Sequence, residues 1–296
     1  MAAATHSRRH MPIVLPYSTK VALHTHECVR TRLAGRQRIV SVMLAAAGIC
    51  ERAARSPGME SDVGRFYTAA MSSIVAVLRT SPATVLRDIR RAMELAGAMT
   101  ALPADRDTAL KVNISWHYFY PACSTTPWQL DGVIRALRRF GHPVERLWAC
   151  HNRTVVIDAR LGERENRHRS VVEAHRVRNV HLYEPGIEWV HIRDAVGSLA
   201  DRFLVLNHVY PDGFHIPRAF LGANIVHLPT VKTHVFTTTT GAMKNAFGGL
   251  LNEHRHWTHP VIHETLVDLL RIQRHIHSGL FAVMDGTWAG DGPGPR

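Results

Sequence analysis

The sequence lacks the cysteine arrangements and long apolar runs that define several classes of protein. Its four cysteines include no C-x-x-C pair of the kind that holds zinc or an iron–sulfur cluster, which favours scattered thiols in a reducing compartment. The longest apolar run, residues 39–50, is too short to span a bilayer. We therefore predict a cytoplasmic protein with no membrane partner and no iron–sulfur cluster.

Acidic residues are also outnumbered, with 24 Asp+Glu against 36 Lys+Arg, a net charge of +12 and a pI near 10.3. A basic surface can bind nucleic acid through the phosphate backbone. However, half of the excess lies in residues 1–72, which carry 10 basic and four acidic side chains. The rest of the chain is only mildly basic for its size, which disfavours nucleic acid as the partner.

Lysine is scarce among the basic residues. The only lysines are Lys20, Lys111, Lys232 and Lys244, and all other basic side chains are arginine. Where arginine supplies almost all of the positive charge, each remaining lysine suggests a specific role. The three lysines after residue 72 are therefore candidates for a role that needs a compact, titratable ammonium group.

Short apolar runs alternate with helical periods from residue 73 onward, and this alternation predicts an α/β fold. We expect a mostly parallel, Rossmann-like sheet with helices on both faces. Helices are predicted over residues 81–98, 126–141 and 164–176; the first two begin at Ser-Pro and Thr-Pro pairs that supply an N-cap and an N1 proline. Strands are predicted at residues 74–78, 109–114, 144–149, 180–183, 203–206, 224–228 and 281–284.

The domain organisation follows from the same patterns. Residues 1–72 are predicted to form a basic, partly helical extension, with one helix over residues 37–55. Residues 73–296 are predicted to form the α/β domain. Because the chain ends in a Gly- and Pro-rich loop straight after the last predicted strand, we expect this domain to be truncated at its C-terminal end.

Three polar clusters follow predicted strands, at the edge where open α/β sheets bind ligands. They are Lys111-Val112-Asn113, Lys232-Thr233-His234 and Asp285-Gly286. Residues 237–249 lie between the last two clusters and lead from four threonines through Gly241 to Lys244, Asn245 and Gly248. Threonines and glycine before a helix start expose backbone N–H groups to an anion, although the Walker pattern is absent. The alternative is a capped helix with a solvated lysine.

These clusters supply the candidate site residues. His234 is the best candidate for a general acid or base, because histidine alone titrates near neutral pH without help, and Lys232 and Lys244 are the other candidate catalytic residues. The helical acids Glu264 and Asp268 are alternatives as a general base. The predicted ligand-binding residues are Lys111, Asn113, Thr233, Thr240, Gly241, Asn245, Gly248 and Asp285.

Histidine is abundant, with 21 residues, and four of them are closely spaced between residues 254 and 263. His259 and His263 are four residues apart, as in helical zinc sites, but the H-E-x-x-H order is absent and Pro260 lies between them. His263 is the candidate metal ligand. No cofactor follows from these patterns.

The segments around the three lysines resemble a known family. The runs Leu228–His234, Thr240–Asn245 and Val283–Gly286, together with Lys111-Val112-Asn113, are similar to the family catalogued as domain of unknown function 362. The resemblance covers residues 73–296 and implies an α/β fold with a shared polar site. Some members carry a ferredoxin-type cysteine segment, from which this chain departs.

The leading hypothesis is a small-molecule enzyme or binding protein with a site for a phosphate or carboxylate group. One alternative is a metal or iron–sulfur-associated redox protein. The other is a nucleic-acid binder that acts through the basic extension. None of these hypotheses specifies an oligomeric state.

Overall fold

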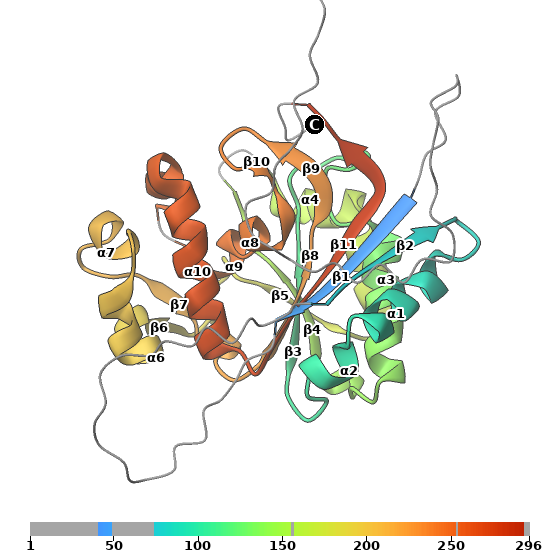
Figure 1. Cartoon of the computed structure of the whole chain (residues 1–296), viewed down its shortest axis with the longest axis horizontal. Helices are drawn as coiled ribbons and strands as arrows, with labels where there is room; N and C mark the ends of the chain where they lie inside the picture. The colour runs from blue at the N-terminus through green and yellow to red at the C-terminus, as the bar shows by residue number, and fades with distance from the viewer. Residues whose placement is uncertain (1–40, 49–73, 155–156, 253, 293–296) are drawn as a thin grey trace, which may run out of the picture.

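The computed structural model describes residues 41–48, 74–154, 157–252 and 254–292. One mixed sheet runs through these residues in the order β10-β9-β11-β8-β3-β4-β5, and β1 joins β2 to β11 (Figure 1). Neighbours from β9 to β5 pair in parallel, whereas β1 and β10 pair antiparallel. The strands are β1 (Ser41–Gly48), β2 (Val75–Thr80), β3 (Thr108–Val112), β4 (Leu147–His151), β5 (Arg178–His181), β8 (Asn224–Leu228), β9 (Thr230–His234), β10 (Thr238–Thr239) and β11 (Gly279–Gly290).

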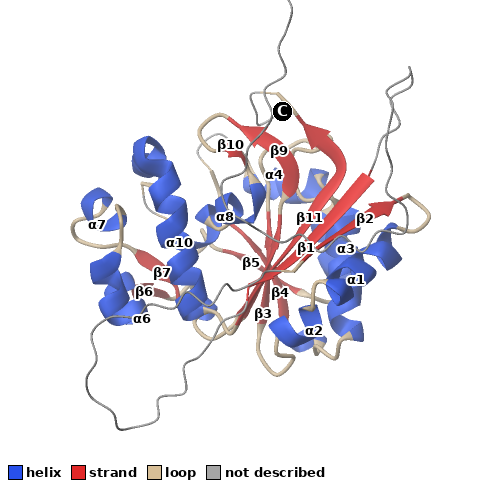
Figure 2. Ribbon diagram, viewed as in Figure 1, coloured by secondary structure: helices blue, strands red, loops and turns tan. Residues whose placement is uncertain are grey.

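Helices cover both faces of the sheet (Figure 2), which confirms the predicted α/β architecture. They are α1 (Val85–Leu95), α2 (Ala98–Ala101), α3 (Pro127–Arg139), α4 (Ala159–Glu165), α5 (His168–His175), α6 (Ile192–Val196), α7 (Leu206–Val209), α8 (Gly241–Asn245), α9 (Phe247–Leu250) and α10 (Ile262–Ile276). A separate two-stranded sheet joins β6 (Trp189–His191) to β7 (His215–Pro217). Short 3-10 turns are η1 (Val144–Arg146), η2 (Gly197–Arg202), η3 (Arg218–Phe220) and η4 (Arg255–Val261). Within the described ranges, no helix combines the length and apolar character that a membrane crossing requires.

Two hydrophobic cores lie on opposite faces of the sheet. Successive side chains of β3 point to opposite faces, so Leu110 packs into the core formed with α1 and α3, whereas Ala109 packs into the core formed with α6, α9 and α10. Strands buried on both faces are mostly apolar. β3 and β8 are buried at all five positions, and they were predicted from their apolar residues although Lys111 in β3 and His227 in β8 are polar.

Helix α3 begins where the sequence predicts. The Thr126 hydroxyl accepts a hydrogen bond from the Gln129 N–H and the Gln129 side chain accepts one from the Thr126 N–H, which forms a capping box before Pro127 at N1. The Gln129 amide also donates to the carbonyls of Pro229 and Val283. The same cap therefore ties the helix start to the junction between β8 and β9 and to β11.

The other two predicted helices are each interrupted. The helix predicted over residues 81–98 ends at Leu95, and α2 follows Gly97, whose φ of 78° is in the left-handed region. The helix predicted over residues 164–176 is two helices, α4 and α5, separated by Arg167 with a φ of 61°. A left-handed residue cannot continue a right-handed helix.

The helix predicted over residues 37–55 is wrong where the structure describes this range. Residues 41–48 form β1, which pairs with β11 from Val42 to Gly48 and with β2 from Ser41 to Ala46. A short Ala-rich apolar run has no period that separates a buried strand from a helix, so only the pairing with distant strands decides. The remainder of the predicted extension lies outside the described residues. The division at residue 72 stays a prediction, although β1 contributes a strand to the sheet.

The strand predicted at residues 203–206 is also wrong. The fully buried carboxylate of Asp268 accepts the backbone N–H groups of Leu204 at 2.8 Å, Val205 at 3.0 Å and Leu206 at 3.3 Å. These donors are therefore satisfied by α10 rather than by a neighbouring strand. Asp268, an alternative candidate for a general base, therefore has a structural role in this fold.

We expect Asp268→Asn to destabilise the fold strongly. The substitution keeps one acceptor oxygen but places an amide donor against backbone N–H groups, and unsatisfied buried donors cost roughly 2 to 5 kcal/mol in total. Urea unfolding would measure this loss. Glu264→Gln, an exposed acid on the same helix, is the matched control and should change stability by less than about 0.5 kcal/mol. Equal stabilities of the two variants would contradict the role of Asp268.

Candidate functional site

A cavity of about 340 Å³ lies at the carboxyl ends of β3 and β4, where β9 and α8 close over it. Lys111, Lys232 and Lys244 all line this cavity, so three of the chain's four lysines meet in one place. We call it the lysine pocket. Its other lining residues are Val112, Asn113, Ile114, Ser115, His151, Asn152, Thr154, Ile157, Thr233, His234, Val235, Thr240, Asn245, Phe247, Gly248 and Arg255.

Lys111 is on β3, and its side chain is buried beneath the α8–α9 segment. Its Nζ donates to the Val112 carbonyl at 2.7 Å, and the Asn245 amide donates to the Lys111 carbonyl at 2.8 Å. A Cβ at Gly248 would lie 3.3 Å from Nζ, so glycine allows the backbone to approach this closely. Burial, with a smaller contribution from Arg255, lowers the pKa of Lys111 to about 8.

Lys232 enters the pocket from β9. Its Nζ donates to the Ser115 hydroxyl at 2.5 Å and to the Cys123 carbonyl at 2.6 Å. Burial lowers the pKa of Lys232 to about 8. The ammonium group is thus held by neutral oxygens, with the pocket beside it.

Lys244 comes from α8 and lies over an aromatic ring, with its Nζ 4.0 Å from the centroid of Phe247. Its pKa is lowered to about 8 by burial and by the charges of Arg255 and Lys232. Because α8 has only five residues, the helix dipole on which the predicted anion cradle relied is small. The positive charge of the pocket therefore resides in the side chains.

His234 lies at the end of β9, and its Nδ1 accepts the Phe236 N–H at 3.2 Å. Burial, followed by the charges of Lys244, Lys232 and His259, lowers its pKa to about 4. The imidazole is consequently neutral at pH 7 in the absence of a bound anion. A neutral imidazole can act as a general base, but it must first be protonated to act as a general acid.

No ion pair joins Lys111, Lys232 or Lys244 to a carboxylate among the residues that the structure describes. Every ion pair in this part of the chain involves arginine or histidine. Arg255 adds a further positive charge to the lining, and its guanidinium donates to the Arg153 carbonyl. The pocket thus gathers cations that the described residues do not neutralise.

Most residues predicted for the site from the sequence meet in this pocket. In addition to the three lysines, they are Asn113, Thr233, His234, Thr240, Asn245 and Gly248. Gly241 begins α8 outside the lining, with a φ of 57°. Asp285 is buried on β11, where its carboxylate accepts the Thr126 hydroxyl and the Thr287 N–H. The roles of all these residues stay predictions.

His263, the predicted metal ligand, is exposed on α10. Within the described residues, the group of three or more side chains with metal-ligating atoms close together lies elsewhere, at His151, Glu163 and His181. We call these three residues the His–Glu–His cluster. Their ligand atoms all lie within 4.8 Å of one another.

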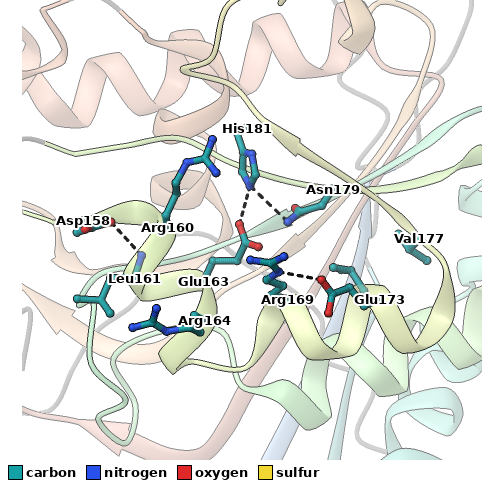
Figure 3. A pocket seen from close by; sticks show the side chains of 11 residues that line it. Asp158, Arg160, Leu161, Glu163, Arg164, Arg169, Glu173, Val177, Asn179 and His181 are labelled. Atoms are coloured by element: carbon teal, nitrogen blue, oxygen red, sulfur yellow. Dashed lines mark hydrogen bonds and ion pairs between the residues drawn. The ribbon is translucent and has the colours of Figure 1, made fainter.

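The cluster is held by neighbouring strands and one helix. His151 ends β4 and His181 ends β5, where the two residues are register partners, and Glu163 reaches them from α4 (Figure 3 shows Glu163 and His181). Glu163 Oε2 lies 2.9 Å from His151 Nε2 and 2.6 Å from His181 Nε2. Burial opposes ionisation of Glu163, but the hydrogen bonds from both histidines outweigh it and lower its pKa to about 2. Burial also lowers the pKa of His151.

A signal for part of this cluster was present in the sequence. His151 and His181 follow apolar strands at the edge of the sheet where the lysine clusters were found, so the same positional rule applies to them. Glu163 carried no such signal, because its position depends on the path of the chain between β4 and α4.

One family model, described as domain of unknown function (DUF362), matches residues 108–296, which is more than half of the chain and contains the whole lysine pocket and the His–Glu–His cluster. No curated protein and no solved structure matches the chain.

Proposed function

This chain belongs to the family described as domain of unknown function (DUF362), and we propose that it is a small-molecule enzyme or binding protein whose lysine pocket holds a phosphate or carboxylate group. The observation that carries the proposal is the meeting of Lys111, Lys232 and Lys244 in one cavity without an ion-pair partner among the described carboxylates. The proposal includes the cytoplasmic location predicted from the sequence.

Electrostatics supports an anionic ligand. Burying ammonium groups near one another is costly, and the cost appears here as a pKa of about 8 for each of the three lysines. At neutral pH most of each lysine population is still protonated. An anion in the pocket would supply the missing counter-charge, and compact ammonium groups bind phosphate and carboxylate oxygens well.

The size of the pocket supports a small ligand. Its volume of about 340 Å³ falls at the lower end of the roughly 300–1,000 Å³ of small-molecule sites. Backbone and neutral side-chain groups, such as the Asn113 and Asn245 amides, surround the lysines and could orient the uncharged part of a ligand. A metabolite with one or two anionic groups fits this setting better than a polymer does.

In an enzyme, the same groups would have distinct chemical roles. Lys232 and Lys244 would stabilise negative charge that develops on the substrate. His234 would act as a general base in its neutral form, and the charge of a bound anion would raise its pKa from about 4 towards the working range.

We expect Lys244→Ala to weaken phosphate binding by about ten- to a hundredfold, because it removes one charge-assisted contact of roughly 1.5 to 3 kcal/mol. The stability of the ligand-free protein should not fall, since a buried cation is removed and alanine favours helices. Isothermal titration with phosphate and with a dicarboxylate, alongside thermal melts, would measure both quantities.

Lys20→Ala removes the same charge from the N-terminal extension and should leave phosphate binding unchanged. Lys244→Arg tests the geometry, because a planar guanidinium replaces a compact ammonium and should restore only part of the affinity. Equal binding by wild type and Lys244→Ala would reject this pocket as the anion site.

A further inference from the structure

We propose that His151, Glu163 and His181 bind a divalent transition metal ion of the zinc class. Two imidazole nitrogens and one carboxylate oxygen converge here from β4, β5 and α4, and these are ligands that zinc prefers. The inference goes beyond the proposed anion site and rests on different observations, although His151 also lines the lysine pocket.

The distances suit a metal with a small adjustment. Ligand atoms of a tetrahedral zinc lie roughly 3.3 Å apart, as zinc–ligand bonds of about 2.0–2.1 Å require. Glu163 Oε2 lies 2.9 Å and 2.6 Å from the two Nε2 atoms, and no pair of ligand atoms is more than 4.8 Å apart. A shift of the Glu163 side chain by less than about 1 Å would open the centre of the cluster.

The contacts of His181 also favour a cation between the ligand atoms. Its Nδ1 lies 3.1 Å from Glu184 Oε1, while its Nε2 lies 2.6 Å from Glu163 Oε2. A neutral imidazole carries one N–H for these two carboxylates, so one ring nitrogen turns a lone pair towards a carboxylate oxygen unless the ring holds a second proton or a metal binds at Nε2. His151 Nε2 points at the same oxygen, so a metal could accept one lone pair from each of the three groups.

The pair formed by Glu184 and His181 has the form of an outer-shell contact. Metal-bound histidines usually donate the other ring N–H to a carboxylate, which fixes the tautomer and the ring orientation. Glu184 is itself held by an ion pair with Arg160. In this arrangement Glu184 is a positioning residue for His181 rather than a ligand.

The surroundings leave one side of the cluster accessible. His151 and Glu163 are both buried, but Glu163 and His181 line a cleft of about 540 Å³ (Figure 3), and His151 lines the lysine pocket. Three protein ligands with an open side are typical of catalytic zinc sites, in which water or substrate takes the fourth position. When bound, such an ion would supply Lewis acidity or an activated water at this cleft.

The test is zinc binding by the full chain after chelator treatment and dialysis. We expect one tightly bound Zn²⁺ per chain, and Co²⁺ in its place should give the visible absorption of a site with nitrogen and oxygen ligands. Glu163→Gln and His181→Ala should each lose this binding. Glu184→Gln should weaken it by about ten- to a hundredfold through loss of the outer-shell contact.

His263→Ala is the matched control, because it removes an exposed histidine that was also a candidate ligand. It should keep the tight zinc site. Absence of zinc binding by wild type, or equal zinc affinity of wild type, Glu163→Gln and His181→Ala, would overturn the proposal. Loss of the site in His263→Ala with retention in Glu163→Gln would also overturn it.

Circular dichroism would show whether the variants fold. If Glu163→Gln and His181→Ala both fail to fold, anomalous scattering from zinc-soaked wild-type crystals decides the question. An ion between His151, Glu163 and His181 supports the proposal, and zinc only at other histidines refutes it. Because no phosphate is present in these experiments, their outcome is separate from that of the lysine pocket.

Discussion

Replacing Lys111 and Lys244 together with methionine is expected to remove most sulfate binding and to make the ligand-free protein more stable. Each charge-assisted contact contributes roughly 1.5 to 3 kcal/mol, so losing both should weaken binding by about a hundred- to ten-thousandfold. Sulfate is the probe because its charge is constant near neutral pH. Isothermal titration would measure the affinity.

The opposite change in stability follows from burial. Lys111 is 4% exposed and its Nζ has only a neutral carbonyl as its described hydrogen-bond acceptor, so methionine of similar length removes a desolvated charge. At position 244 methionine can keep contact with the Phe247 ring. Exchanging buried charges for apolar groups often stabilises a protein by about 1 to 4 kcal/mol, which urea unfolding would detect.

The matched control is the Arg138→Met, Arg139→Met double variant, which removes two positive charges from the exposed end of α3. It should change neither sulfate binding nor stability appreciably. Unchanged sulfate binding by the lysine variant would place the anion site elsewhere. A large loss of stability would instead identify the lysines as structural residues.

Local signals account for the parts of this fold that could be predicted from the sequence. The start of α3 is encoded by Thr126, Pro127 and Gln129 within four positions, and β8 contains the apolar residues Ile225, Val226 and Leu228. Lys111 and Lys232 could be predicted as site residues because each follows or ends a predicted strand at the same edge of the sheet. The scarcity of lysine then singled out Lys244 in the adjoining segment.

The errors arose where distant partners decide the structure. Residues 203–206 have the composition of a strand, yet Asp268, more than 60 positions later, accepts three of the backbone N–H groups of this run. Residues 41–48 have the composition of a helix, yet they pair with β11 at the far end of the described chain. Neither interaction leaves a trace in the local pattern.

The two histidines of the His–Glu–His cluster were missed for another reason. In a chain with 21 histidines, His151 and His181 did not stand out by composition, whereas the closely spaced group ending at His263 did. The topology shows that closeness in sequence was the weaker guide. Adjacent parallel strands place the ends of β4 and β5 side by side, although 30 residues separate the two histidines.

Sulfate binding to the lysine pocket is expected to weaken steeply as the pH rises above about 8. The pKa values of Lys111, Lys232 and Lys244 are each about 8 in the ligand-free protein, so all three lose their charge at a pH where exposed lysines keep theirs. Each lysine whose proton sulfate binding requires contributes up to about a tenfold loss per pH unit above its pKa. Sulfate itself does not titrate there.

Stability of the ligand-free protein should change in the opposite direction. The folded lysines have pKa values below the 10.5 of an unperturbed side chain, so between about pH 8 and 10.5 the unfolded chain binds more protons than the native protein. The free energy of unfolding therefore rises through this window from the lysines alone. Bound sulfate raises the lysine pKa values and stabilises the folded protein mainly below pH 8. The free energy of unfolding therefore depends less on pH when sulfate is present.

The measurement is sulfate affinity and urea stability at pH values from about 7 to 10 for wild type and the Lys111→Met, Lys244→Met variant. Wild-type affinity should fall across this range, and the variant, with one of the three lysines left, should show a much smaller dependence in both quantities. In the ligand-free protein His234 is neutral throughout the range because its pKa is about 4, so it adds no titration to the stability profile. Sulfate affinity that stays level from pH 7 to 10 would assign the binding to arginine, whose charge persists, and would exclude the three lysines as the anion site.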